Sequence, residues 1–222
     1  MCFGPNKIVA VTAILLKFKE SISSDPFTTL ESWNSSIHFC KWRGITCNPK
    51  HQRVIGLNLS GYQVHGYLSP YIGNLTFLKN LTLQNNNFYG EIPQALGQLL
   101  QLQRLSLTNN SFVGEIPTNL TYCSNLKILD LGGNNLIGKI PIEIGSLKKI
   151  QIISVYKNKL TGGIPSFIGN LSSLIALSIV CRLKNLTFLS VGENNLSGTP
   201  PSCLYNISSF IQLFMAANSF LC

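Results

Sequence analysis

The chain has 222 residues, of which 45% are hydrophobic and only 11% are charged, and its formal net charge is +9. This composition is too apolar for a disordered chain, and the longest apolar run, Ile8 to Leu16, is about half of the ~18–20 residues that a membrane-spanning helix needs. The 33 leucines, 22 asparagines and 18 glycines combine residues that favour burial with residues that favour turns. They predict a short apolar unit and a turn, repeated many times.

The first fifty residues do not follow such a unit. Residues 1–12 contain Lys7 followed by an apolar stretch, which suggests a leader remnant or an incomplete signal peptide. Residues 13–53 are expected to form a cap that covers the apolar end of the repeats that follow. Apolar side chains from Ala13 to Ile22 recur at helical spacing, and Asp25 is expected to end this helix because it precedes a proline.

The repeat itself is 24 residues long. Full units begin at Val54, Leu78, Leu102, Leu126, Ile150 and Leu186. Positions 4 and 6 alternate as in a strand, so both leucines point inward. Position 9 is an asparagine whose amide can bond the backbone of the following turn, and position 13 is a glycine at the bend. Because one unit cannot bury its own leucines, we expect a solenoid of stacked units.

The spacing breaks once. Pro165 and Pro201 lie 36 residues apart, where two units would require 48. We therefore expect about seven repeats over residues 54–222, one of them shortened by 12 residues at 174–185 and the last one cut off. The break is as consistent with a mis-spliced gene as with a natural variant.

The repeat resembles the plant extracellular class of leucine-rich repeats, as in Leu102-Gln-Arg-Leu105-Ser-Leu107-Thr-Asn-Asn110 through Ile116-Pro117. The segment that contains Trp33, Cys40 and Cys47 is similar to the N-terminal cap of plant leucine-rich-repeat receptor-like serine/threonine kinases. The resemblance implies an α/β fold, a right-handed curved solenoid with a parallel β ladder on its concave face. It also implies a helical cap with a Cys40–Cys47 disulfide.

Ten Asn-x-Ser/Thr sequons and the implied disulfide fit the secretory pathway. We expect glycosylation to favour the sequons away from the strands, which are Asn34, Asn74, Asn170 and Asn206. Asn58, Asn80 and Asn109 fall in or beside strands, where a glycan would cover part of the concave face. Cys123 takes a leucine position and is expected to be a buried free thiol, and the pairing of Cys2, Cys181, Cys203 and Cys222 stays open.

No catalytic, cofactor or metal motif is found. The sequence lacks a GxSxG elbow, kinase loops and any Cys/His spacing typical of zinc. The cations are dispersed at one or two per unit, which argues against nucleic acid as a partner. A basic surface could instead attract acidic peptides or pectin.

Binding is what such a scaffold offers. Positions 3, 5, 7 and 8 of each strand are free of core packing and face the concave side. We expect ligand contacts at Arg104, Asp130, Tyr156 and Lys157, and Gly132-Gly133 beside Tyr156 could admit a peptide backbone.

The resemblance implies the ligand-recognition part of a plant receptor-like kinase that signals in defence or development. It would bind a peptide or protein, recruit a co-receptor ectodomain of the same repeat class, and sit outside the plasma membrane through a downstream helix. The alternatives are a secreted inhibitor similar to polygalacturonase-inhibiting proteins, a receptor-like protein without a kinase, and a non-functional fragment. Expressed as this piece alone, the chain would be secreted or apoplastic.

Overall fold

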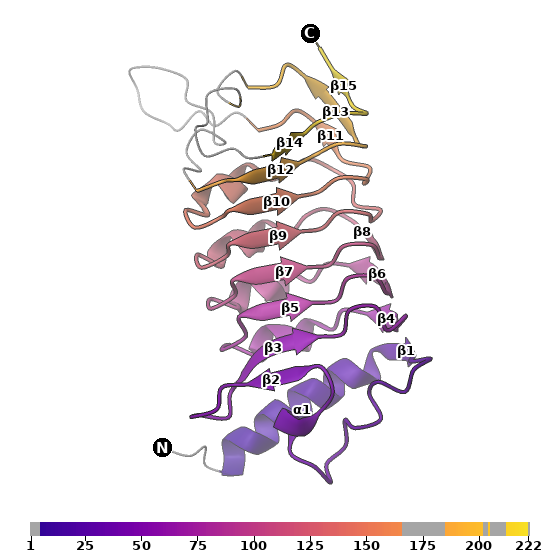
Figure 1. Ribbon diagram of the computed structural model, residues 1–222, viewed down its shortest axis with the longest axis vertical. Coiled ribbons are helices and arrows are strands. Elements are labelled where there is room, and N and C mark those ends of the chain that lie inside the picture. The colour runs from indigo at the N-terminus through magenta and orange to yellow at the C-terminus, as the bar shows by residue number, and fades with distance from the viewer. Residues whose placement is uncertain (1–4, 166–184, 202–203, 205–211, 222) are drawn as a thin grey trace.

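The structure is a computed structural model and describes residues 5–165, 185–201, 204 and 212–221. These residues form an elongated stack of coils, with helix α1 (Pro5–Glu20) lying across its N-terminal end (Figure 1). Each coil contributes one short strand to the same face, as the sequence repeat predicts. The expected solenoid with a parallel β ladder is confirmed.

The main sheet has eight described strands, in the order β14-β12-β10-β9-β7-β5-β3-β2. All neighbours are parallel except β2, which is antiparallel to β3. The strands are β2 (Ile45–Cys47), β3 (Val54–Asn58), β5 (Asn80–Thr82), β7 (Arg104–Ser106), β9 (Ile128–Asp130), β10 (Ile152–Ser154), β12 (Phe188–Ser190) and β14 (Gln212–Phe214).

Shorter ladders and single-turn helices complete each coil. One ladder has the order β1-β4-β6-β8 and the other β11-β13-β15. Their strands are β1 (Ile22–Ser24), β4 (His65–Tyr67), β6 (Asn87–Glu91), β8 (Ser111–Val113), β11 (Thr161–Gly162), β13 (Asn195–Gly198) and β15 (Ser219–Phe220). The 3-10 helices are η1 (Phe39–Lys41), η2 (Pro70–Asn74), η3 (Gln94–Gln98), η4 (Thr118–Tyr122) and η5 (Ile142–Ser146). Pro93, Pro117 and Pro141 precede η3, η4 and η5 in extended conformation, because proline fixes φ.

The core runs through the stack as one continuous cluster. Leu102, Leu105 and Leu107, at positions 1, 4 and 6 of one unit, are all fully buried. The rings of Phe88 and Phe112 from successive coils stack with their centroids 6.2 Å apart. Burial of leucine at each repeat is the term that holds one coil on the next.

An asparagine ladder connects the turns. Nδ2 of Asn110 donates to the carbonyl of Leu107 in its own turn and to that of Leu83 in the preceding coil, at 2.9 and 3.0 Å. Its Oδ1 accepts from the backbone N–H of Phe88 at 2.9 Å. The same pattern recurs in Asn86, Asn134, Asn158, Asn194 and Asn218. The predicted role of position 9 is therefore confirmed, and the amide satisfies backbone groups that the turn leaves without partners.

At the break in spacing, β10 and β12 pair directly with each other. Ile152 pairs directly with Phe188, 36 residues later, whereas 24 residues separate paired residues at every other parallel step of the main sheet. Asn194 also bonds the preceding coil directly, at Leu160 and Val155. β10 and β12 are thus direct neighbours in the main sheet, and residues 174–184 of the shortened repeat expected at 174–185 lie outside the described part.

The cap differs from the prediction at both ends of its helix. α1 begins at Pro5, so residues 5–12 are helical and continuous with the cap segment expected from residue 13. It ends at Glu20 rather than near Asp25. The reason is Ser21, whose hydroxyl bonds the carbonyls of Phe18 and Tyr67 and turns the chain into β1, which pairs with β4. Asp25 instead accepts two backbone N–H groups of the following loop.

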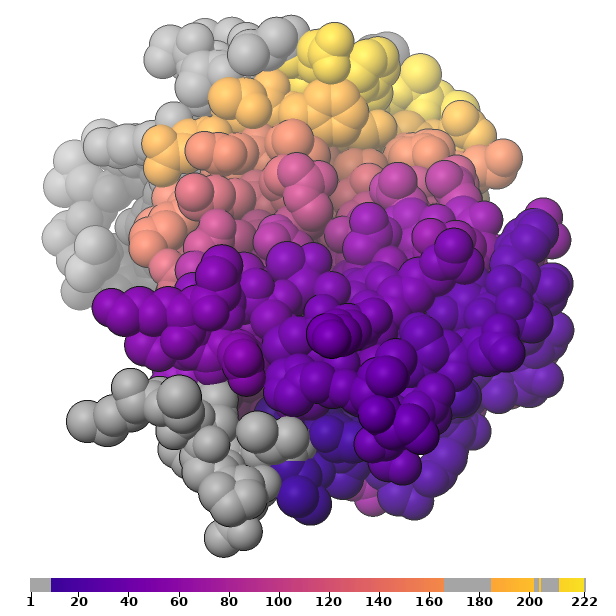
Figure 2. Space-filling model, turned by 60° about the horizontal axis from the view of Figure 1, so that its bottom comes forward, coloured from indigo at the N-terminus to yellow at the C-terminus, as the bar shows by residue number. Residues whose placement is uncertain are grey.

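Aromatic packing joins the cap to the first coils. The indole rings of Trp33 and Trp42 stack at 5.4 Å, and Phe18 of α1 lies 5.9 Å from Trp33 and 6.3 Å from Phe88. All four side chains are almost fully buried. The N-terminal residues consequently spread over the end of the stack and cover it (Figure 2). The apolar surface of the first coil is shielded from water in this way.

Candidate ligand-binding face

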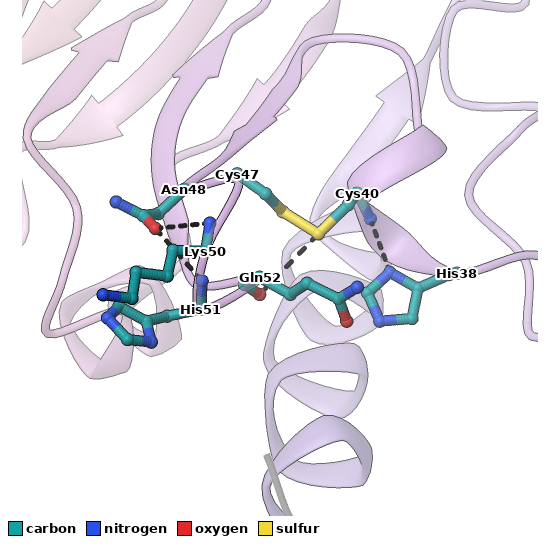
Figure 3. The surroundings of a disulfide bond; sticks show 7 residues. All are labelled: His38, Cys40, Cys47, Asn48, Lys50, His51 and Gln52. Carbon is teal, nitrogen blue, oxygen red and sulfur yellow. Dashed lines mark hydrogen bonds between the residues drawn. A yellow bond between two sulfur atoms is a disulfide. The ribbon is translucent and has the colours of Figure 1, made fainter. Parts of the chain in front are cut away.

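The cap contains the expected disulfide. Cys40 and Cys47 are bonded, with their Cα atoms 5.5 Å apart, and the bond ties η1 to the end of β2 (Figure 3). Nδ1 of His38 accepts from the backbone N–H of Cys40 at 3.2 Å. Oδ1 of Asn48 accepts from the backbone N–H groups of Lys50 and His51 and shapes the turn that follows β2. The bond therefore fixes β2, the edge strand on which the main sheet begins.

Cys123 is a buried free thiol, as predicted. Its Sγ lies 3.4 Å from the carbonyl oxygen of Leu96, and burial raises the pKa of the thiol to about 11. The thiol is protonated at neutral pH and packs as a small apolar side chain. Cys2, Cys181, Cys203 and Cys222 lie outside the described residues.

The concave face has a hollow near its N-terminal end. This hollow has a volume of about 300 Å³ and lies over β2, β3, β5 and β7. Arg104 on β7 and Thr46 on β2 line its two ends, and Ile55, Leu57 and the sequon residues Asn80 and Thr82 are among the residues between them. The side chains of Arg104 and Asn80 are exposed. An exposed guanidinium next to the in-register amide of Asn80 is suited to a carboxylate.

Three titratable groups from successive described coils lie close enough in the middle of the face to influence one another electrostatically. Burial raises the pKa of Tyr156 above its usual value, and the nearby carboxylates of Asp130 and Glu193 raise it further. We call Asp130, Tyr156 and Glu193 the acidic tyrosine cluster. The sequence singled out Asp130 and Tyr156, which the structure brings together, but did not select Glu193. The signal was present, since Glu193 occupies the same position 8 as Lys157 in the next described coil.

The tyrosine ring lies on Gly132. A β-carbon built on Gly132 would collide with the ring of Tyr156, so the ring already occupies the space that the glycine leaves open. The expectation that Gly132-Gly133 admits a peptide backbone is therefore wrong for Gly132. Lys157, the fourth predicted contact, is exposed and has a positive φ of 50° in the turn that follows β10.

Apolar side chains line the C-terminal half of the face. Ile128, Ile152 and Phe188 occupy position 3 in successive strands and are paired in register. The ring of Phe188 lies 5.8 Å from that of Phe214, which is 51% exposed. We call these four residues the apolar strip. Position 3 thus changes from Asn80 and Arg104 to Ile128, Ile152 and Phe188 and becomes polar again at Gln212. The apolar strip therefore lies among the charged side chains of the same coils.

Two predicted glycosylation sites fall in the described part. Asn34 lies in the cap, where its Nδ2 donates to the carbonyl of Glu31 at 3.2 Å. Asn74 is exposed at the end of η2. Asn170 and Asn206 lie outside the described residues.

Among the described residues no three His, Cys, Asp or Glu side chains are placed to hold a metal ion. None of the helices described here has the length and apolar character to cross a membrane.

Comparisons with known proteins agree with this architecture. Residues 12–48 match the leucine rich repeat N-terminal domain, and the Leucine Rich Repeat family matches residues 77–99, 101–123, 125–147, 149–171 and 185–207. The LRR receptor-like serine/threonine-protein kinase EFR of Arabidopsis thaliana is 48% identical over 75 residues. That segment covers 33% of this chain and 7% of the kinase.

Solved structures match over more of the chain. The crystal structure of PEPR1–AtPEP1 has a TM-score of 0.83 and 32% sequence identity over 94% of this chain and 28% of that one. The plant peptide hormone receptor RGFR1 in complex with RGF2 has a TM-score of 0.65 and 27% identity over 71% of this chain and 23% of that one.

The fold and the face define a capped solenoid with an open parallel sheet, which is a scaffold for binding. The chain belongs to the leucine-rich repeat family, and its curated relatives include plant leucine-rich-repeat receptor-like kinases.

Proposed function

We propose that the chain is the ligand-recognition part of a plant leucine-rich-repeat receptor-like kinase and that it binds an extracellular peptide on its concave face. The observation that carries the proposal is the arrangement of this face, with Arg104 at the hollow near one end and the apolar strip, accompanied by charged side chains, further along the stack. A surface that combines charge with exposed aromatic rings is typical of interface anchors.

This arrangement favours a peptide that carries a carboxylate, a cation and apolar side chains. A carboxylate of the peptide pairs with Arg104, and its apolar side chains cover the strip at Phe188 and Phe214. A cation of the peptide lies near the acidic tyrosine cluster. Lys157 contributes at the rim, where long side chains set the association rate more than the affinity.

The parent protein would place this part outside the plasma membrane. A spanning helix and a serine/threonine kinase would follow the repeats, and peptide binding would recruit a co-receptor ectodomain of the same repeat class. The similarity to EFR and to two receptor ectodomains supports this arrangement. Defence and development are both signalling roles that such a receptor could serve.

The full-length transcript tests whether the parent protein is a receptor-like kinase. Sequence downstream of residue 222 should encode further repeats, one spanning helix and a kinase. A stop codon after a few more repeats would overturn the receptor proposal. In that case, binding to fungal pectinases would identify the secreted polygalacturonase-inhibitor alternative, and a spanning helix without a kinase would identify a receptor-like protein.

A further inference from the structure

A second hollow lies at the N-terminal end of the stack, away from the concave face. Its volume is about 310 Å³, and it separates helix α1 from the first coil. Val11 and Ile14 of α1 line one side, and Arg53, Asn74, Thr76 and Phe77 line the other. Because Asn74, Leu75 and Thr76 form an Asn-x-Thr sequon, the acceptor asparagine and the sequon threonine both border the same hollow.

We propose that this hollow holds the first N-acetylglucosamine of an N-linked glycan attached to Asn74, and that the sugar fastens α1 to the first coil. The proposal rests on the secretory route that the proposed function assumes, but it does not depend on any ligand of the concave face. The attachment uses a lipid-pyrophosphate-linked oligosaccharide. A bond forms between C1 of the sugar and Nδ2 of Asn74, the bond from C1 to the pyrophosphate oxygen breaks, and the amide nitrogen loses one proton to the transferring enzyme.

The Asn74 amide is available in the folded chain. Its side chain is exposed at the end of η2, and within the described part it makes no side-chain hydrogen bond. Other sequon asparagines use Nδ2 in the fold. That of Asn109 donates to Asn85 at 2.8 Å and that of Asn185 to the carbonyl of Lys148 at 3.0 Å. A glycan at those two positions would replace an existing hydrogen bond, and at Asn74 it would not.

The lining suits a sugar ring. A pyranose has one face of C–H groups, which packs on an aromatic ring, and an N-acetyl methyl group, which packs on aliphatic surface. Phe77 is 41% exposed, and the guanidinium carbon of Arg53 lies 3.9 Å from its ring centroid and holds the ring in place. Val11 and Ile14 are partly buried and pack against the core. Covering Phe77 together with Val11 and Ile14 would remove apolar surface from water on both sides of the junction.

The experiment uses the chain secreted from glycosylating cells. Glycopeptide mass spectrometry measures occupancy at Asn74, and amide hydrogen exchange measures protection of α1. N74Q is expected to speed exchange in α1 and to lower Tm by about 2–4 °C. The matched control is N119Q, which removes a sequon in η4, remote from α1, and should leave α1 exchange unchanged.

Two further samples make the result specific. Trimming every glycan to a single N-acetylglucosamine should preserve the α1 protection, because only the first sugar is needed. F77A keeps the sequon, so occupancy should persist while the protection is lost. An unmodified Asn74, or a modified Asn74 whose removal affects α1 no more than N119Q does, would overturn the proposal. Failure to find a concave-face ligand would leave both measurements unaffected.

Discussion

Replacing Asn134 by alanine removes one member of the asparagine ladder from the centre of the stack. Asn134 is 8% exposed, and its Nδ2 lies within 3.1 Å of the carbonyl oxygens of Leu107, Leu131 and Gly132. Its Oδ1 accepts from the backbone N–H of Phe112 at 3.0 Å. The substitution therefore deprives the turn of its donors and leaves a buried N–H group without an acceptor.

The magnitude follows from these contacts. The amide of Asn134 has two N–H hydrogens to share among the three carbonyl oxygens, so two donated bonds are counted, at about 1 kcal/mol each. The N–H group of Phe112 that is left unpaired costs about 1–3 kcal/mol. The free energy of unfolding should fall by about 3–5 kcal/mol. Asn87→Ala is the matched control, because Asn87 is exposed and donates only a 3.3 Å bond to Gln63. Its effect should stay below about 0.5 kcal/mol.

Urea unfolding followed by circular dichroism gives both values. The m value must match that of the parent chain, since a smaller m would mean that fewer coils unfold together. A loss in Asn134→Ala no larger than in Asn87→Ala would refute the idea that the amide ladder, together with the leucine core, holds the coils in register.

Three further predictions concern the cap and the concave face. Replacing both Cys40 and Cys47 by serine should lower the free energy of unfolding by about 2–3 kcal/mol, and reductant should lower the parent chain to the same level but leave the variant unchanged. Gly132→Ala should destabilise the chain by about 1–3 kcal/mol because its methyl group collides with Tyr156, and equal destabilisation in a Tyr156→Ala background would contradict this. Because the fold raises the pKa of Tyr156, the contribution of this tyrosine to stability is complete below its unfolded-state pKa and is lost as pH rises through its folded-state pKa. The difference in tyrosinate absorbance between the parent chain and Tyr156→Phe should show that Tyr156 titrates at a higher pH than a free tyrosine. Asp130→Asn should lower the pH of this titration.

The repeat predicted most of the fold, because its positions are set by local geometry that recurs in every coil. Leu105 and Leu107 are buried and Asn110 bonds two turns, as periodicity alone indicated. The helix end at Glu20 was missed because proline at position 26 is a strong local signal. The hydroxyl of Ser21, which bonds Tyr67 from a distant segment, ends the helix first.

The candidate site was predicted only in part. Strand positions indicate which side chains face the concave side, so Asp130 and Tyr156 were found. The sequence cannot show that the Tyr156 ring lies on Gly132, because a side-chain rotamer depends on the packing of neighbouring coils.

The central claim is that a peptide binds the concave face. A photoreactive benzophenone amino acid placed at Tyr156 in the full ectodomain, exposed to the peptide fraction of plant apoplastic fluid, tests it most directly. The same group at Tyr122, which is 64% exposed in η4, is the control. We expect mass spectrometry to find peptides with an acidic group and apolar residues crosslinked at position 156 and not at position 122. Crosslinking confined to position 122, or equal at both, would contradict it.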